Sequence, residues 1–306
     1  MARAGPRLGL TVVRPAPSHP HRLVYLGTPE VAVPPLQALH AAGFEIALVV
    51  TRADKRRGRG KGLSPSPVKA AALELGLPVT TDVDAVLDVG ADLGVVVAFG
   101  RIIKPHVLDA VPMVNLHFSL LPRWRGAAPV ERAILAGDQR TGVCLMVVEE
   151  GLDTGGIYRQ VEVEIGADET LDELRDRLVE IGARMVVEAM EEGLGEPEPQ
   201  EGEPIYADKI EPSELHLDWS RPASELHRIV RLGGAWTTWR GKRLKLHSAG
   251  LAEDADGAPG SLDGTVVATG DGGLELLEVQ PEGKGHQPAT AWLNGARPGP
   301  DDRLGG

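Results

Sequence analysis

The chain has 306 residues, 42% of them hydrophobic and 25% charged, which is enough to bury one sizeable core and a second, smaller one. Its net charge of -12 disfavours a broad nucleic-acid-binding surface, because phosphates must be met by cations. The single cysteine, Cys144, excludes an internal disulfide and a cysteine-based zinc site, and no apolar run is long enough to span a bilayer. We therefore expect a two-domain cytoplasmic protein in which Cys144 is a small buried strand residue.

The chain begins with a segment that differs from the rest. Residues 1–21 are basic and rich in proline, without the apolar region of a signal peptide, and we expect them to form a disordered extension. A short apolar strand follows at Arg22–Leu26. The next helix is expected to have Thr28 as its N-cap and Pro29 as its first residue, and Gly43 ends it.

A strongly basic segment follows the second expected strand, Glu45–Thr51. Between residues 52 and 69 the only acid is Asp54, and glycines at 58, 60 and 62 alternate with cations. The basic residues of this segment are Arg52, Lys55, Arg56, Arg57, Arg59, Lys61 and Lys69. A cationic loop on an acidic protein is a local electrostatic footprint for phosphate, and a solvated charged loop is the alternative interpretation. Ser66 then caps a further helix, which Gly76 closes.

The centre of the chain predicts a mostly parallel sheet. Leu93–Ala98 is aliphatic without polar alternation, as expected for a strand buried on both faces, and Met113–Leu116 and Val143–Val148 continue the series. Pro129–Ala136 is expected to be the helix between the last two strands. Strands that alternate with helices indicate a Rossmann-like α/β fold with flanking helices, but the first turn lacks the GxGxxG spacing of a dinucleotide site.

The rest of the chain predicts a long helix, a linker and a second domain. Thr170–Glu192 has the apolar spacing of an amphipathic helix, and a segment rich in Gly, Glu and Pro follows it. Beyond this linker, a helix at Ala223–Arg231 and short strands separated by Gly-rich turns indicate a small OB-like β-barrel. These strands are expected at Arg243–His247, Thr265–Thr269 and Leu274–Val279. The expected boundaries are 1–21 for the extension, 22–192 for the α/β domain, 193–210 for the linker and 211–306 for the barrel.

Three polar residues are candidates for catalysis. Asn115 and His117 lie two apart at the end of an expected strand, so their side chains point to the same face of the sheet. Asp153 lies in a glycine-flanked turn after another strand, and the carboxyl ends of strands border the ligand crevice in such sheets. The three groups are therefore expected to share one cleft. From spacing alone, a structural histidine and two turn-forming residues are the alternative.

The sequence around these residues closely resembles the folate-dependent formyltransferases. The resemblance is carried by NLHFSLLPRWRGAAPVERAILAGDQRTGV from Asn115 and by GLDTGGIY from Gly151. Further matches are YLGTPEVAVPPLQAL at Tyr25, GRGKGLSPSPVKAAA at Gly58, YADKI at Tyr206 and DWS at Asp218. These four matches point, within the family, to the enzymes that formylate methionyl-tRNA. The similarity extends from about Arg22 to Leu293.

The resemblance implies roles for particular residues. Asn115, His117 and Asp153 match the family's catalytic residues. The family's folate-contacting turn is matched by Ser119, Leu120, Leu121 and Pro122. The loop that enters the tRNA acceptor stem is matched by the segment with Arg52, Lys55, Arg56, Arg57, Arg59 and Lys61. The barrel matches an accessory tRNA-binding domain, but residues 211–306 carry ten basic and fourteen acidic side chains, so only a face around Arg240–Lys245 is expected to contact phosphate.

In the implied reaction, 10-formyltetrahydrofolate donates its formyl group to the α-amino group of initiator methionyl-tRNA, giving N-formylmethionyl-tRNA for translation initiation. We expect Asn115 and a protonated His117 to stabilise the developing oxyanion. Asp153 is expected to orient the imidazole, raise its pKa and help to take the amine proton. No step requires a metal, and Ser119 lacks the motif of a nucleophile elbow, which favours direct transfer.

Other functions are compatible with parts of the sequence. Relatives with the same three residues formylate a ribonucleotide or an amino sugar, or hydrolyse formylfolate, and the basic loop alone would fit a non-catalytic RNA-binding protein. Consumption of 10-formyltetrahydrofolate only in the presence of charged initiator tRNA would distinguish these functions. The resemblance further implies a monomer.

Overall fold

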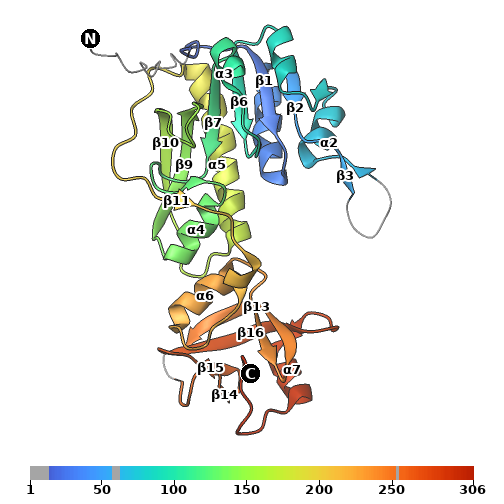
Figure 1. Cartoon of the computed structure of the whole chain (residues 1–306), viewed down its shortest axis with the longest axis vertical. Helices are drawn as coiled ribbons and strands as arrows, with labels where there is room; N and C mark the ends of the chain where they lie inside the picture. Colours follow the sequence, from blue (N-terminus) through green and yellow to red (C-terminus); the bar gives the residue numbers. More distant parts are fainter. Residues whose placement is uncertain (1–13, 57–62, 253–254) are drawn as a thin grey trace, which may run out of the picture. The chain divides into compact units, whose positions relative to one another are not determined.

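The computed structural model describes residues 14–56, 63–252 and 255–306, which form two compact units (Figure 1). The first unit comprises residues 1–125, 142–161 and 178–205, and the second comprises residues 126–141, 162–177 and 206–306. Of the expected disordered extension, residues 14–21 are described and make contacts in the first unit. The Arg14 guanidinium donates to the carbonyl of Ala110, and the Ser18 carbonyl accepts from the amide of Leu194.

A seven-stranded sheet, with the order β10-β9-β7-β6-β1-β2-β5, forms the centre of the first unit. Its strands are β1 (Arg22–Gly27), β2 (Glu45–Val50), β5 (Val79–Thr80), β6 (Leu93–Val97), β7 (Met113–His117), β9 (Arg140–Val147) and β10 (Ile157–Glu164). The five strands from β7 to β5 are parallel, which confirms the predicted Rossmann-like, mostly parallel sheet. The strand order reverses at β1, because β2 lies on one side of it and β6 on the other. Sheets of this kind bind ligands beyond the carboxyl ends of the strands at such a switch point.

One strand departs from the predicted series. The expectation that Val143–Val148 continues the parallel strands is wrong, since β9 runs antiparallel to β7, with Val114 opposite Val147 and His117 opposite Cys144. The intervening helix α4 (Pro129–Ala136) packs against α6 (Ala223–Arg231) in the second unit. Because α4 does not return the chain along the sheet as a crossover helix, β9 enters from the opposite end.

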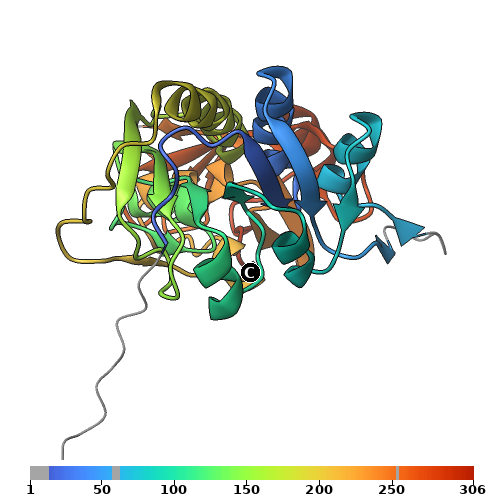
Figure 2. The same ribbon diagram turned by 90° about the horizontal axis from the view of Figure 1, so that it is seen from above.

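Helices cover both faces of the sheet (Figure 2). The helices of this unit are α1 (Val33–Ala41), α2 (Pro67–Glu74), α3 (Pro105–Ala110) and α5 (Leu171–Glu192), with short 3-10 turns at η1 (Glu30–Ala32) and η2 (Asp84–Asp88). On one face, Val107 of α3 belongs to the same buried cluster as Val24 of β1. On the other, Gly182 of α5 lies against Leu116 of β7. Successive strand residues point to opposite faces, so the neighbours of Leu116 point away from α5.

The start of α1 also differs from the prediction. Thr28 is not its N-cap, because η1 comes first and α1 begins only at Val33. A helix that began at Pro29 would place Pro34 and Pro35 in its interior, where each would lack a backbone hydrogen bond. The Thr28 hydroxyl instead lies 3.4 Å from the carbonyl oxygen of Phe99. The predicted cap of α2 is confirmed, since the Ser66 hydroxyl accepts from the amide of Lys69 at 3.1 Å.

Where the sequence predicts a small β-barrel, the second unit contains an antiparallel sheet in the order β12-β13-β16-β15-β14, with β17 paired to β16. Its elements are η3 (Pro212–Leu215), β12 (Trp236–Trp239), β13 (Lys242–Ala252), β14 (Leu262–Asp263), β15 (Val266–Ala268), β16 (Gly273–Pro281), β17 (Gln287–Pro288) and α7 (Ala289–Ala296). The last residues of the chain join the two edges of this sheet, because Leu304 bridges to Trp239 of β12 and Arg303 bridges to Ser261 beside β14. The sheet is thereby closed into a barrel-like ring.

Two further pairs of short strands complete the architecture. β3 (Lys55–Arg56) pairs with β4 (Leu63–Ser64), and β8 (Arg125–Gly126) pairs with β11 (Tyr206–Ala207). In the described part of the chain, no helix has both the length and the apolar character that crossing a bilayer requires.

Replacement of Leu304 by alanine should destabilise the second unit. This side chain is 3% exposed, and loss of a buried leucine side chain costs about 2–5 kcal/mol of unfolding free energy. Leu251→Ala, at a leucine of β13 that is 57% exposed, is the matched control and should cost far less. Urea unfolding followed by tryptophan fluorescence measures both, since four of the five tryptophans lie in this unit. If both variants lose the same unfolding free energy, Leu304 does not hold the ring closed.

Candidate active site

Asn115 and His117 lie at the carboxyl end of β7, where the parallel strands of the sheet end. Both side chains point away from α5, because the residue between them, Leu116, faces that helix. Asn115 is half-buried, and its side-chain amide makes no hydrogen bond to any described residue. The amide is therefore available to a ligand in the crevice beyond the strand ends.

His117 is almost completely buried, with 5% of its surface exposed. Its Nε2 lies 2.8 Å from the carbonyl oxygen of Trp124, and since a carbonyl can only accept, Nε2 carries a proton and donates it. Burial lowers the pKa of His117 below its ordinary value, although the Asp153 carboxylate and the Trp124 carbonyl act in the opposite direction. The ring is therefore neutral at neutral pH, with an unprotonated Nδ1. The lowered pKa disfavours the expected protonated form of His117 in the free protein, because desolvation of the ring outweighs the nearby anion.

Asp153 is brought to His117 by a loop. Its Oδ2 lies 3.7 Å from Nδ1 of His117, which is close but longer than a hydrogen bond. The expected reason, two strands ending at the same edge of the sheet, does not hold, because β9 is antiparallel and its end at Val147 lies beside Val114 near the start of β7. The loop from 148 to 156 must therefore fold back toward the carboxyl end of β7. Asp153 adopts a left-handed backbone conformation within it, with a φ of 51°.

A residue that the sequence placed in the linker also belongs to this site. The side-chain amide of Gln200 donates to the carbonyl oxygens of Asp153, at 2.9 Å, and Gly155, at 2.8 Å. Its Oε1 accepts from Nε and Nη2 of Arg125, at 3.0 and 2.6 Å. Gln200 lies in an irregular segment without periodicity or a chemical motif, so nothing in the pattern of the sequence indicated these contacts.

The predicted folate turn directs its side chains both inward and outward. Ser119 is completely buried, and its hydroxyl donates to the carbonyl oxygen of Arg123 at 2.6 Å. Leu121 is also buried, whereas Leu120 and Pro122 are half-buried and keep exposed surface. Of the four residues, Leu120 and Pro122 thus have side-chain surface that a ligand can reach in this conformation.

Cys144 is the buried strand residue that the sequence predicts. Its thiol is within hydrogen-bonding distance of the Ser119 carbonyl, at 3.1 Å, and of Gln160 Oε1, at 3.3 Å. Burial raises the pKa of the Cys144 thiol to about 11, so it stays protonated at neutral pH. The thiol therefore contacts the backbone of the predicted folate turn as a structural group.

The basic segment begins at the carboxyl ends of the parallel strands, the same end of the sheet at which β7 ends. Arg52 follows the carboxyl end of β2, and its Nη2 donates to the carbonyl oxygen of Gly100, beyond the carboxyl end of β6, at 2.9 Å. Lys55 and Arg56 form β3, which pairs with β4. The two strands lie on either side of residues 57–62 in the sequence. Arg57, Arg59 and Lys61 lie outside the described residues.

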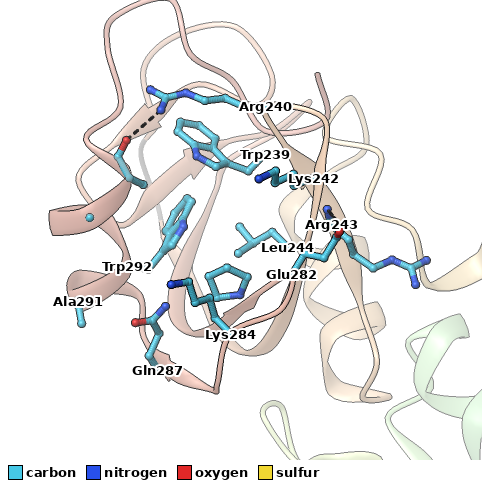
Figure 3. Close-up of a pocket in the computed structure, with 13 residues that line it drawn as sticks. Trp239, Arg240, Lys242, Arg243, Leu244, Glu282, Lys284, Gln287, Ala291 and Trp292 are labelled. Atoms are coloured by element: carbon cyan, nitrogen blue, oxygen red, sulfur yellow. Dashed lines mark hydrogen bonds between the residues drawn. The ribbon is translucent and has the colours of Figure 1, made fainter.

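The second unit contains a hollow of about 570 Å³ beside β13 (Figure 3). Trp239, Leu244 and Trp292 line it together with the side chains of Lys242 and Lys284. The hollow lies in the region around Arg240–Lys245 where the sequence predicted a phosphate-facing surface. An aromatic wall next to ammonium groups suits a planar or anionic ligand.

No group of three or more His, Cys, Asp or Glu side chains among the described residues is arranged to hold a metal ion. The chemical groups that meet at the end of β7 are instead an amide, a neutral imidazole and a carboxylate. Such groups can bind an oxyanion and move a proton, which are the two requirements of acyl transfer to an amine.

Two family models match the chain. Residues 21–190 match the model described as formyl transferase, and residues 209–297 match the model of the formyl transferase C-terminal domain. A methionyl-tRNA formyltransferase from Jannaschia sp. (strain CCS1) is 46% identical to the chain, over 91% of the chain and 98% of that protein. A methionyl-tRNA formyltransferase from Heliobacterium modesticaldum is 44% identical, over 93% of the chain and 100% of that protein.

Solved structures show the same fold at lower sequence identity. HypX from Aquifex aeolicus, in complex with tetrahydrofolic acid, superposes with a TM-score of 0.64 at 18% identity, over 92% of the chain and 48% of that protein. The N-formyltransferase from Helicobacter canadensis, in complex with folinic acid and dTDP-3-aminofucose, also has a TM-score of 0.64 at 18% identity, over 85% of the chain and 98% of that protein. With both family models and full-length relatives in agreement, this chain belongs to the methionyl-tRNA formyltransferases of the formyl transferase family.

Proposed function

We propose that this protein transfers the formyl group of 10-formyltetrahydrofolate to the α-amino group of methionine on initiator methionyl-tRNA, for use in translation initiation. The observation that carries the proposal is identity of 43–46% to methionyl-tRNA formyltransferases over 90% or more of the chain, both family models included. Structural neighbours that contain tetrahydrofolic acid or folinic acid support a folate donor. The same relatives disfavour a sugar, a ribonucleotide or a purely RNA-binding role.

The neutral imidazole suggests how the acceptor amine is activated. An ammonium group cannot attack, so the α-amino group reacts as the neutral amine after one proton has gone to solvent, and its nitrogen must lose a second proton as it bonds to the formyl carbon. Nδ1 of His117 is unprotonated and lies beside the Asp153 carboxylate, so the two groups together form an acceptor for that proton. Proton uptake turns His117 into an imidazolium, which the adjacent carboxylate stabilises.

The remaining steps use the side-chain amide of Asn115 and the proton that His117 has taken up. As the new C–N bond forms, the formyl oxygen gains negative charge, and we expect the Asn115 amide to donate a hydrogen bond to it. Collapse of this intermediate breaks the bond to N10 of the folate. The imidazolium of His117 then gives its proton to the departing nitrogen, so the ring acts first as base and then as acid.

The cell compartment follows from the same reaction, and the assembly state is the one that the family resemblance implies. We place the protein in the cytoplasm, where charged tRNA and reduced folate occur together, and we expect it to act as a monomer. The folate is expected to lie in the crevice at the carboxyl ends of β1, β6 and β7, against Leu120 and Pro122 of the turn.

Replacement of Asn115, His117 or Asp153 by alanine should lower turnover by at least about 10²-fold, because each removes a group that acts in the transition state. The affinity for tRNA and the thermal stability should change little. Steady-state kinetics with charged initiator tRNA, together with thermal unfolding, provides the test. Near-normal turnover of Asp153→Ala would remove this carboxylate from the mechanism.

The protonation of His117 can be measured directly by NMR titration of its ring. Because burial lowers its pKa, the ring should gain a second proton only below about pH 6.5, the ordinary value for histidine. Asp153→Asn removes an anion that raises this pKa, so the ring of the variant should titrate at still lower pH. A ring that is already protonated at pH 7 would return His117 to the role of a cationic oxyanion donor.

Neutralisation of the basic loop should weaken tRNA binding and leave folate binding unchanged. Changing Arg57, Arg59 and Lys61 to Gln should reduce the slope of log K against log salt by up to about 2–3, if each cation meets a phosphate. A triple change of the exposed Lys104, Arg140 and Arg184 to Gln removes the same charge elsewhere and is the matched control. Salt-dependent binding to charged tRNA measures both variants. If the loop variant matches the control, the loop does not contact the tRNA.

A further inference from the structure

We propose that Gln200 is a positioning residue for catalysis, which holds Asp153 beside His117, and that Arg125 fixes the orientation of its amide. The proposal rests on the proposed function for the role of Asp153. It assigns a part in the reaction to a segment that otherwise looks like a simple connection between domains.

The hydrogen-bonding capacity of the Gln200 side chain is fully used. An amide has two N–H donors and one oxygen with two lone pairs, and here the donors meet the carbonyls of Asp153 and Gly155 while the oxygen accepts twice from Arg125. A guanidinium can only donate and carbonyl oxygens can only accept. The amide therefore fits in one orientation, and its N–H groups must face the Asp153 loop.

The Asp153 loop has a conformation that needs such support. Asp153 has positive φ, an uncommon conformation for a residue with a side chain. Two residues later the backbone passes so close to β9 that a Cβ on Gly155 would overlap the Val147 carbonyl. At 3.7 Å, the contact between Asp153 and His117 is too long to fix the carboxylate by a direct hydrogen bond. Gln200 donates hydrogen bonds to the backbone carbonyls on both sides of Thr154. These bonds fix the backbone of Asp153, which carries the carboxylate.

Arg125 connects Gln200 to the residue that holds His117, the other member of the catalytic pair. The carbonyl of the preceding residue, Trp124, accepts the hydrogen bond from His117 Nε2. The dipeptide Trp124–Arg125 therefore holds the imidazole through its main chain and the Asp153 loop through a side chain and Gln200. The contacts form a closed ring. It runs from His117 through Trp124 and Arg125 to Gln200, then to Asp153 and back to His117. One continuous network therefore sets the position of the Asp153 carboxylate relative to the His117 base.

The Gln200 side chain is not required to anchor its own segment. Two backbone hydrogen bonds join Glu198 to Ile157, and the amide of Arg125 donates to the carbonyl of Ile205 at 2.8 Å. These bonds lie on both sides of Gln200 along the chain and involve no side chain. Removal of the amide should therefore leave the path of the segment intact and release only the Asp153 loop.

The test compares Gln200→Ala and Gln200→Glu with Glu201→Ala, a control at the next, exposed position of the same segment. Gln200→Glu keeps an acceptor for Arg125 but has no donor for the loop carbonyls, so it should fail like the alanine variant. We expect kcat to fall by about 10- to 100-fold in both, since misplacement of a catalytic group by about 1 Å costs up to about 10²-fold. The KM values for tRNA and folate should stay within about threefold of those of the control.

Two further readouts separate positioning from a structural role. In Gln200→Ala the pKa of the His117 ring, followed by NMR, should fall as it does in Asp153→Asn, because the carboxylate is no longer held near it. Arg125→Ala should lower kcat as well, and the double variant with Gln200→Ala should be no slower than the slower single variant, because the two residues act as one unit.

Several results would overturn the proposal. These are a kcat equal to that of Glu201→Ala, a rise in KM at unchanged kcat, an unchanged His117 titration, or a lowered melting temperature with normal turnover below it. Wild-type protein is assayed in parallel with charged initiator tRNA. If the wild type does not formylate it, the proposed function fails, whereas the NMR titration still decides whether Gln200 positions Asp153.

Discussion

The hydrogen bond from His117 Nε2 to the carbonyl of Trp124 is the constraint on which the chemistry of the site depends. It assigns the ring proton to Nε2 and leaves Nδ1 as a base directed toward Asp153. Burial of the ring keeps it neutral, since the pKa of His117 is lowered. A protonated ring would be a better oxyanion donor but could not accept the amine proton, so the bond fixes which nitrogen is the base and burial of the ring favours the mechanism in which it acts as one.

Local features of the fold follow directly from the sequence, because they depend on residues that are near in the chain. The Ser66 cap, the buried strand at Leu93–Val97 and the shared orientation of Asn115 and His117 are of this kind. The direction of β9 is not, because it depends on whether α4 packs on the sheet or on α6 in the second unit. The position of Asp153 was predicted correctly for a reason that the antiparallel strand invalidates.

Properties that arise from the whole fold could not be predicted from the sequence in the same way. The sequence shows that Asp153 can raise the pKa of His117, but the opposing effect of burial depends on the residues that surround the ring in three dimensions. Gln200 likewise reaches the site from a segment 47 residues after Asp153. Its neighbours in sequence are the Pro and Glu residues of a connection, and only tertiary contact reveals its four hydrogen bonds.

The acidic net charge of the chain is also misleading about its partners. Many arginines of the second unit are paired with carboxylates, as Arg132 is with Glu214, Arg177 with Glu169 and Arg240 with Asp302. Such pairs cancel locally and contribute little to the field beyond a Debye length. The field that a polyanion meets is therefore set locally by the charges that remain unpaired, and an acidic protein can bind tRNA where its cations are concentrated.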